Sequence, residues 1–391
     1  MENRASQNVN MDEPTKTILF EKEQSGITYR IPALIYLQEV QTFLAFAEKR
    51  LSSSDHEAKI LVMRRGTMTE DGSVEWSSTQ ELQSATLPNH RTMNPCPVYE
   101  KKSNTVFLFF ICVWKSVTEQ KQIHTGKNQT RLCYVTSTDN GQTWSNVTDL
   151  TETVIGETIN NWATFGVGPG HGVQLEDGRL IIPAYAYYIP QRESGTVPRA
   201  LAIYSKDDGK TWRLSEMLRE DSSECEMAEI IDHEGKSHLY CNARSITKGH
   251  RCEALSEALS ENSDVSFDQV HFASELVEPP FGCQGSIIAF PAPESAPDTQ
   301  TWLLFMHPTH ECCRRDMGVY LNRSPLQSSG WETPTIIHSG PSGYSDLAYH
   351  GDKNTFSGLM ECGEESELEQ IAFVTFSLND VMQQEGQQDE D

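Results

Sequence analysis

An eight-residue pattern that occurs twice in the chain constrains its fold more than any other feature. Ser-Thr-Asp-Asn-Gly-Gln-Thr-Trp at 137–144 matches Ser-Lys-Asp-Asp-Gly-Lys-Thr-Trp at 205–212, and each copy follows a strand-like run. In such a segment Asp folds back onto backbone N–H groups, Gly supplies a positive φ, and Trp buries its ring. The pattern predicts a β-hairpin turn with a structural role, far from catalytic chemistry.

The spacing of the repeat indicates a β-propeller. The two copies begin 68 positions apart in a chain of 391 residues, and division by that spacing gives about six units, as in a propeller of four-stranded blades. A third, degenerate copy spans 260–267, where the Gly is lost and Phe267 replaces Trp.

The rest of the chain is consistent with strands. Short runs rich in β-branched and aromatic residues recur throughout, whereas helical periodicity is scarce; the clearest helical candidate, 249–259, is ambiguous. No Pro/Gly/Ser-rich linker divides the chain. We therefore expect an all-β, six-bladed β-propeller formed by one domain over 17–382, with a flexible segment at 1–16 and a flexible acidic tail at 383–391.

Charge and cysteine content exclude several classes of protein. The 31 Lys and Arg residues against 56 Asp and Glu give a net charge of −25, which argues against nucleic-acid binding and against long-range attraction to an anionic membrane. The ten cysteines include no Cys-x-x-Cys pair, so we expect reduced thiols. The polar start of the chain lacks an apolar signal region, so the sequons at Asn128, Asn146 and Asn322 are expected to be unused.

Three arginines stand in similar settings near strand-like runs. Arg30 lies in Tyr-Arg-Ile-Pro, Arg244 in Cys-Asn-Ala-Arg-Ser, and Arg314 follows His-Pro-Thr-His. Contributed by separate blades, they could clamp one carboxylate by charge-assisted hydrogen bonds. Each one taken singly is more often part of a surface ion pair. His171 and the pair His307 and His310 have no third ligand cluster beside them in the sequence, so no metal and no cofactor is predicted.

The repeat resembles the aspartate box of sialidases, and Tyr29-Arg-Ile-Pro32 resembles their YRIP/FRIP motif. Stretches such as GITYRIPALIY, TFLAFAEKR, HRTMNPCPV, NWATFGVGPGHG, PAYAYYIP and LEQIAF extend the resemblance to animal sialidases over nearly the whole chain. The resemblance implies the propeller fold and an exo-α-sialidase, which removes terminal sialic acid. It assigns the carboxylate of that sugar to Arg30, Arg244 and Arg314, with Glu361 orienting Arg30.

The resemblance also implies the catalytic residues. Tyr344 matches the family nucleophile and Glu224 the carboxylate that accepts its proton, because a free phenol with a pKa near 10 needs an adjacent base. Sialidases are an established exception, with a Tyr nucleophile, to the two-carboxylate rule of glycosidases. Asp55 matches the family acid/base. Glu57 is an alternative on chemistry alone, and the spacing from Arg50 favours Asp55.

Further residues match the substrate contacts of the family, although core packing explains any one of them about as well. They are Arg50, Met93, Asn94, Glu119, Tyr185, Tyr187 and Gln284.

The resemblance implies retaining hydrolysis through a tyrosyl-enzyme intermediate, acting on gangliosides and on other sialylated glycoproteins and oligosaccharides. It favours members that associate peripherally with the plasma membrane; the cytoplasm and endolysosomal membranes are alternatives. Two other functions stay open: a sialic-acid-binding propeller without turnover, and a trans-sialidase that transfers the sugar to another sugar.

Overall fold

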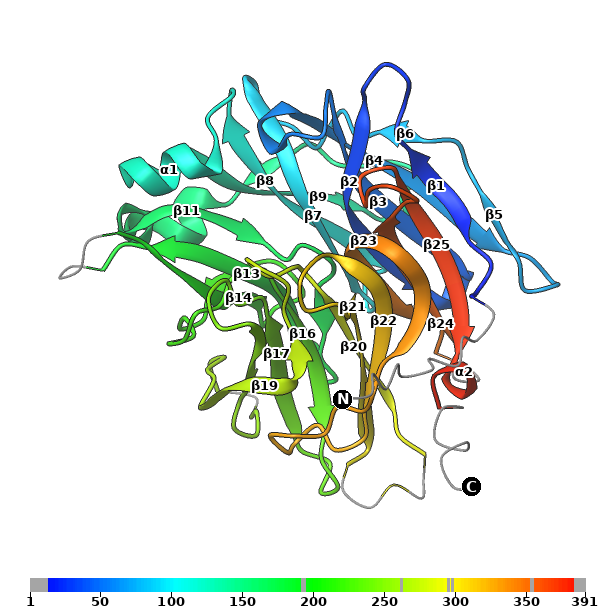
Figure 1. Ribbon diagram of the computed structural model, residues 1–391. Helices are drawn as coiled ribbons and strands as arrows, with labels where there is room; N and C mark the ends of the chain where they lie inside the picture. Colours follow the sequence, from blue (N-terminus) through cyan, green and yellow to red (C-terminus); the bar gives the residue numbers. More distant parts are fainter. Residues whose placement is uncertain are drawn as a thin grey trace, which may run out of the picture.

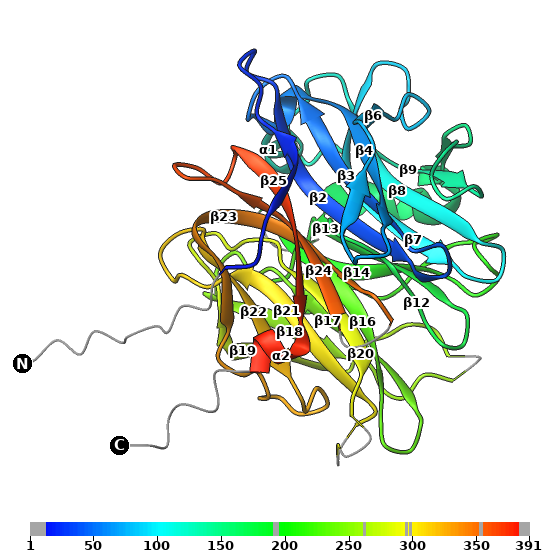
Figure 2. The same cartoon turned by 90° about the vertical axis from the view of Figure 1, so that its right-hand side faces the viewer.

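Strands make up almost all of the regular structure, as the short apolar runs predicted. The computed structural model describes residues 13–190, 195–260, 263–293, 296, 299–351 and 355–382. The predicted all-β class is confirmed, and the sheets are arranged like the blades of a propeller (Figures 1 and 2).

The first three sheets follow one another along the chain, and all their pairings are antiparallel. The first contains β2 (Thr28–Leu37), β3 (Thr42–Arg50), β4 (Ala58–Met68), β5 (Val74–Trp76) and β6 (Gln80–Glu81). The second contains β7 (His90–Glu100), β8 (Thr105–Trp114), β9 (Thr130–Ser137) and β10 (Thr148–Asp149). The third contains β11 (Trp162–Val167), β12 (Val173–Gln174), β13 (Leu180–Tyr188), β14 (Val197–Ser205) and β15 (Arg213–Leu214).

The last two sheets include one long strand whose two halves pair with different neighbouring strands. The fourth sheet contains β16 (Cys225–Ile231), β17 (Ser237–Ala243), β18 (His250–Leu255) and β19 (Gln269–Val277). The seven-stranded sheet has the order β1 (Thr17–Glu21), β25 (Gln370–Ser377), β24 (Thr355–Cys362), β23 (Thr335–Tyr349), β22 (Arg315–Asn322), β21 (Thr301–Pro308) and β20 (Ser286–Pro291). The first half of β23 pairs with β22 and its second half with β24.

The inner strands form a closed ring. β2 contacts both β7 and β23, β13 contacts β7 and β16, and β20 contacts both β16 and β23. The two ends of the chain meet in the last sheet, where β1 is the outer strand and pairs with β25 through Thr17 and Phe373 and their neighbours.

The hydrophobic core lies between adjacent sheets, so most strands are covered on both faces. The strand β8 (TVFLFFICVW) is buried at nine consecutive positions from Thr105 to Val113. Burial on both faces explains why its sequence is a continuous apolar run without alternation. The largest cluster of buried side chains joins the second and third sheets, with Phe109 and Ile182 among its members.

The two repeat turns are held by matching hydrogen bonds. The Asp139 carboxylate accepts from the backbone N–H of Thr143 (2.9 Å) and from its hydroxyl (2.6 Å). The corresponding distances from Asp207 to Thr211 are 2.8 and 2.7 Å. The degenerate copy at 260–267 includes residues 261 and 262, which lie outside the described residues.

The helical candidate at 249–259 is wrong, because this segment contains strand β18. β18 pairs with β17 on one side and β19 on the other. Four of its consecutive residues, Arg251 to Ala254, are buried. When both faces of a strand are covered, its sequence loses strict alternation and helical periodicity can arise by coincidence.

Helices are short. α1 (Glu119–Thr125) and α2 (Leu378–Met382) are α-helical; single turns of other types occur at Gln38–Val40, Asp55–Glu57, Thr151–Ile155 and Gly156–Asn161. Within the described ranges no helix is long and apolar enough to cross a membrane. The predicted flexible ends fall largely on residues 1–12 and 383–391, outside the described residues.

We expect Trp212→Ala to lower the free energy of unfolding by about 3–5 kcal/mol, the usual cost of removing a large buried aromatic ring. Trp212 is 7% exposed, packs edge-on against Phe107 and Phe109, and donates from Nε1 to the Gly209 carbonyl (3.1 Å). Trp144→Ala should also destabilise the fold, by less, because Trp144 is only partly buried.

Urea unfolding would measure both effects, with Trp114→Ala as the control, because Trp114 is 36% exposed. An unfolding free energy of Trp212→Ala equal to that of Trp114→Ala would contradict the bracing role of the repeat.

Candidate active site

A cavity of about 430 Å³ opens among the ends of strands β2, β3, β7, β17, β22 and β23. Five arginines line it in a chain whose net charge is −25. A local concentration of guanidinium groups in an acidic protein indicates an anionic ligand. The ionisable residues in its wall are Arg30, Arg50, Arg91, Arg244, Arg314, Asp55, His56, Glu119, Tyr185, Glu224 and Tyr344.

Tyr344 lies at the centre of the three predicted arginines. Its hydroxyl donates to Glu224 Oε1 (2.6 Å) and accepts from Arg244 Nη1 (3.0 Å). Arg30 and Arg314 face its ring, with their Cζ atoms 5.4 and 5.3 Å from the ring centroid. Three residues that are far apart in sequence therefore converge on one phenol.

Burial favours the protonated form of this phenol. Desolvation and the charge of Glu224 raise the pKa of Tyr344 well above its usual value, although Arg244 and Arg314 act in the opposite direction. A neutral phenol is a weak nucleophile. Glu224 is at hydrogen-bond distance from the phenol and is the nearest group that could take its proton.

Glu361 anchors both Arg30 and the backbone beside Tyr344. Its carboxylate accepts from Arg30 Nε (2.7 Å) and Nη2 (3.1 Å), and from the backbone N–H groups of Ile31 (2.9 Å) and Tyr344 (3.0 Å). Glu361 is fully buried. The contact between Arg30 and Glu361 leaves Arg30 Nη1 without a bond to this carboxylate, so the guanidinium can also bind a ligand.

Asp55 lies at the mouth of the cavity. Its carboxylate pairs with Arg50 Nη1, and its side chain is 73% exposed. Desolvation opposes ionisation, but the charges of Arg50 and Arg30 outweigh it and lower the pKa of Asp55. An exposed carboxyl opposite the buried Tyr344 is well placed to exchange protons with a leaving group or with water.

Comparisons with known proteins agree with this geometry. Residues 41–358 match the family model described as "BNR repeat-like domain". Sialidase-3 of Bos taurus is 47% identical to this chain over 403 residues, which cover 93% of each protein. Sialidase-2 of Cricetulus griseus is 46% identical over 355 residues, 90% of this chain and 92% of that one. The chain belongs to the animal sialidase family. It is thus of the exo-α-sialidase class of glycoside hydrolases.

A solved structure supports the fold of this sialidase. The microbial sialidase Hz136 superposes with a TM-score of 0.75 over 94% of this chain and 69% of that one. Its sequence identity is 22%. The likeness therefore bears on the fold and not on the substrate.

Bulges in three strands aim the site residues of the sialidase into the cavity. Strand pairing shifts register between Arg30 and Ala33, between Met93 and Cys96, and between Ser342 and Ser345. A β-bulge redirects side chains and is common beside active sites. Proline follows Ile31 and Asn94, which both have positive φ (61° and 56°), so these bulges sit where proline removes a ladder donor.

Glu48 connects Arg50 to Asn94 below the cavity. Its carboxylate accepts from Arg50 Nε (2.9 Å) and from the backbone N–H of Asn94 (2.7 Å), and it is fully buried. The Asn94 side chain in turn donates to the Val167 carbonyl (3.2 Å). Arg50 and Asn94 are thereby fixed by one buried carboxylate that the sequence analysis missed, although Glu48 precedes Arg50 by two positions on the same face of β3.

Five of the seven predicted substrate contacts line the cavity and two do not. Met93, Asn94, Glu119 and Tyr185 line the cavity, together with Arg50. The described residues in the wall do not include Tyr187 or Gln284. Tyr187 packs edge-on against Tyr185, with ring centroids 6.4 Å apart. Gln284 is 1% exposed and its amide is bonded to protein groups beneath Tyr344.

Arg91 is a wall residue that the sequence analysis did not single out. It is 6% exposed and donates from Nη1 to the Lys115 carbonyl (2.8 Å), while its Nε has no partner among the described residues. It lies two positions before Met93 in β7, so the same strand alternation that places Met93 in the cavity could have identified it.

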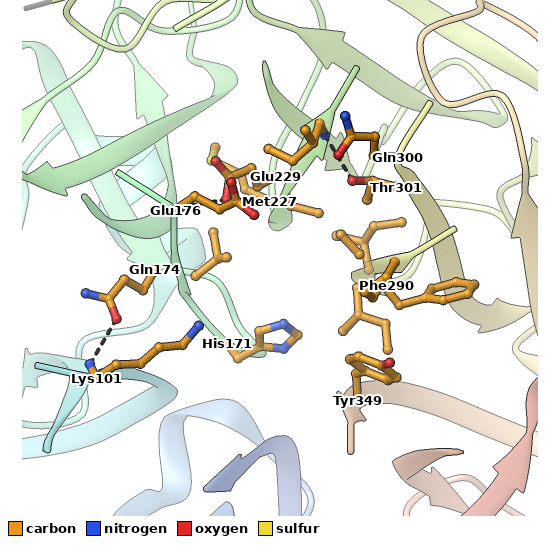
Figure 3. Close-up of a pocket in the computed structure, with 17 residues that line it drawn as sticks. Lys101, His171, Gln174, Glu176, Met227, Glu229, Phe290, Gln300, Thr301 and Tyr349 are labelled. Carbon is orange, nitrogen blue, oxygen red and sulfur yellow. Dashed lines mark hydrogen bonds between the residues drawn. The ribbon is translucent and has the colours of Figure 1, made fainter. Parts of the chain in front are cut away.

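A second cavity of about 450 Å³ is separate from the first and shares no lining residue with it. Figure 3 shows its wall, with the imidazole of His171 pointing into it between Lys101 and Tyr349. His171 also places its Nδ1 2.6 Å from Asp346 Oδ1 and 3.6 Å from Glu226 Oε2. The donor atoms of these three residues lie within 4.8 Å of one another, a grouping that the sequence did not reveal.

We expect Glu119→Gln to stabilise the empty sialidase more at pH 8 than at pH 5. Glu119 is exposed to the cavity, where desolvation and the charges of Glu224 and Asp55 raise its pKa from 4.5 to about 7. In the unfolded chain this carboxyl ionises near pH 4.5. Its contribution to stability therefore falls as the pH rises from about 4.5 through 7, because the folded state then has to hold the charge.

Urea unfolding of the wild type and of Glu119→Gln at the two pH values would measure the difference. An equal difference in unfolding free energy at pH 5 and pH 8 would show that Glu119 does not change its protonation in this range.

Proposed function

We propose that this protein is a retaining exo-α-sialidase that hydrolyses terminal sialic acid from gangliosides and other sialoglycoconjugates through a tyrosyl-enzyme intermediate. The observation that carries the proposal is the 2.6 Å bond from Tyr344 Oη to Glu224, in a cavity with Arg30, Arg244 and Arg314. Sialic acid bears a carboxylate on its anomeric carbon. Arginines that hold this carboxylate would place the anomeric carbon next to the phenol.

In the first displacement, Tyr344 Oη attacks the anomeric carbon as Glu224 takes the phenolic proton, and Asp55 gives a proton to the departing glycosidic oxygen. A neutral phenol suits this attack because a carboxylate would be repelled by the substrate's own carboxylate. Asp55 is ionised in the empty site at neutral pH, since Arg50 and Arg30 lower its pKa. A bound carboxylate offsets the charge of Arg30, and the sugar ring excludes water, so both favour protonation of Asp55.

In the second displacement, water replaces Tyr344 on the anomeric carbon. Asp55, now ionised, takes a proton from the water, and Glu224 returns its proton to the phenolic oxygen. Two inversions leave the configuration unchanged, so proton NMR should detect the α-anomer of free sialic acid first. Initial release of the β-anomer would contradict the tyrosyl intermediate.

We expect Tyr344→Phe to lower kcat on the order of 10³-fold or more, because it removes the attacking oxygen and leaves the ring between its arginines. A fluorogenic α-sialoside would measure this loss, and circular dichroism would confirm that the variant is folded. Wild-type activity in Tyr344→Phe would exclude the proposed nucleophile. Absence of turnover by the wild type at every pH from acidic to neutral would favour a binding propeller instead.

We expect Arg30→Ala to lower kcat/KM about 100-fold, mainly by raising KM, because it removes a charge-assisted contact to the substrate and leaves Glu361 buried without its partner. Arg213→Ala is a matched control, since Arg213 is exposed on β15. Steady-state kinetics with the same sialoside would compare them. If Arg30→Ala and Arg213→Ala had equal KM values, Arg30 would not bind the carboxylate of the substrate.

The trans-sialidase alternative differs only in the acceptor of the second displacement. Product analysis with an added galactoside separates transfer to the sugar from transfer to water. Comparison of a ganglioside, a sialylated glycoprotein and a sialyllactose would identify the preferred class of substrate.

We also propose peripheral association with the plasma membrane, with the cytoplasm or endolysosomal membranes as the alternatives. Cys312 and Cys313 are exposed on the loop that carries Arg314, and acylation of such a pair would supply an anchor near the cavity. A membrane-bound pool that resists both carbonate washing and thioester cleavage by neutral hydroxylamine would rule out this peripheral association.

We infer that the propeller has six blades. The two halves of β23 pair with different neighbours, which supports dividing the seven-stranded sheet into two blades. The matching turns at Asp139 and Asp207 are candidates for its aspartate boxes.

A further inference from the structure

Two buried acids lie two positions further along the chain from the reacting pair, Tyr344 and Glu224. Asp346 follows Tyr344 on β23, and Glu226 follows Glu224 into β16. Each buried acid therefore follows a member of the reacting pair by two positions on the same chain segment. Tyr344 and Glu224 line the first cavity, whereas Asp346 and Glu226 are fully buried beneath it.

The strand β20 lies between these two strands and joins the buried acids. Ser286 Oγ is 3.0 Å from Glu226 Oε2 and 3.0 Å from Asp346 Oδ1. Backbone N–H groups hold each acid as well: Ile287 donates to Glu226 (2.9 Å), and Leu34 of β2 donates to Asp346 (2.6 Å). Four strands are tied together at this point.

Gln284 fixes the residue that separates Tyr344 from Asp346. Its Oε1 accepts from the backbone N–H of Ser345 (2.9 Å), and its Nε2 donates to the carbonyl of the same residue (2.9 Å). Nε2 also donates to the Pro169 carbonyl (3.1 Å) and lies 3.3 Å from Glu226 Oε1. Gln284 thereby holds the two peptide groups on either side of Ser345, next to the phenol.

A shared proton makes the acid pair compatible with burial. Ser286 carries one hydroxyl proton and contacts both carboxyls, so one of the two contacts requires a protonated carboxyl. Desolvation and the charge of Asp346 raise the pKa of Glu226, which favours a proton on this pair of acids. His171 Nδ1 also lies 2.6 Å from Asp346 Oδ1, the same oxygen that Ser286 contacts.

The loop before β12 is shaped to this arrangement. Gly170 has φ +120°, and a Cβ atom there would come within 1.6 Å of Glu226 Oε1. Only glycine permits this approach.

The strands that carry the reacting pair do not bond to each other. Among the described strands, β16 pairs with β17 and β23 pairs with β22 and β24. The backbone ladder therefore does not set the position of Glu224 relative to Tyr344.

We propose that Glu226, Gln284, Ser286 and Asp346 form a positioning network that sets the register of β16 against β23 and so holds Glu224 at hydrogen-bond distance from Tyr344. The network touches neither the substrate nor the reacting atoms. It gives Gln284 a role in place of the substrate contact that the resemblance implied. This inference rests on the proposed function of the Tyr344–Glu224 pair.

The test compares Ser286→Ala and Gln284→Ala with the wild type, using a fluorogenic α-sialoside. We expect kcat to fall about 10- to 100-fold in each, because small misplacements of reacting groups are costly, and KM to change less than about 3-fold. Binding of 2,3-didehydro-2-deoxy-N-acetylneuraminic acid, an unreactive sialic acid analogue, should be retained because the arginines stay in place. A raised KM with unchanged kcat in Gln284→Ala would instead make Gln284 a substrate contact.

Ser357→Ala is the matched control for a lost buried hydroxyl. Ser357 is fully buried on β24 and bonds to His350 Nε2 (2.8 Å), away from the described cavity wall. It should lower the melting temperature as Ser286→Ala does, with kcat unchanged. An equal loss of kcat in both variants would show that Ser286→Ala acts by lowering general stability and not by misplacing Glu224.

The outcomes separate this inference from the proposed function. If the wild type has no sialidase activity, the proposed function fails. If the wild type is active and Ser286→Ala keeps its kcat, the positioning network alone is wrong. A stoichiometric metal in the purified protein, lost in Asp346→Asn, would replace the shared proton with an ion and also overturn the inference.

Discussion

The buried contact between Glu361 and Arg30 is the interaction on which the active site depends. An isolated charge in this environment would be costly, and one with a single partner would still have unsatisfied lone pairs. Glu361 satisfies four N–H donors at once, two from Arg30 and one each from the backbone of Ile31 and Tyr344. One carboxylate thus fixes Arg30 and Tyr344, the proposed anion-binding group and the proposed nucleophile, relative to each other.

Carboxylates serve two separate tasks around this centre. Glu361 and Glu48 are fully buried and hold arginines in place, whereas Glu224 and Asp55 reach the cavity, where the proposed mechanism has them transfer protons. The difference follows from their surroundings and not from residue type. It also explains how a strongly acidic protein can bind an anion: its acids orient the arginines and leave the free guanidinium edges toward the ligand.

Much of this could be predicted from the sequence, and the exceptions have physical causes. Apolar runs identified the strands, and proline after Ile31 and Asn94 was a local signal for the bulges that turn side chains into the cavity. The segment at 249–259 was misjudged because two neighbouring strands cover both faces of β18. Glu226, Gln284 and Ser286 act through contacts between strands that do not pair, and no sequence pattern reports such contacts.

The order of synthesis has a consequence for when the site exists. Arg30 is synthesised early, but its partner Glu361 follows 331 positions later. β1 likewise cannot pair with β25 until the C-terminal part of the chain has been synthesised. Until those last strands leave the ribosome, the growing chain exposes an unmatched sheet edge and has no assembled nucleophile. The contacts that assemble the proposed site therefore require the C-terminal strands, so a chain truncated before Glu361 would lack the carboxylate that orients Arg30 and Tyr344.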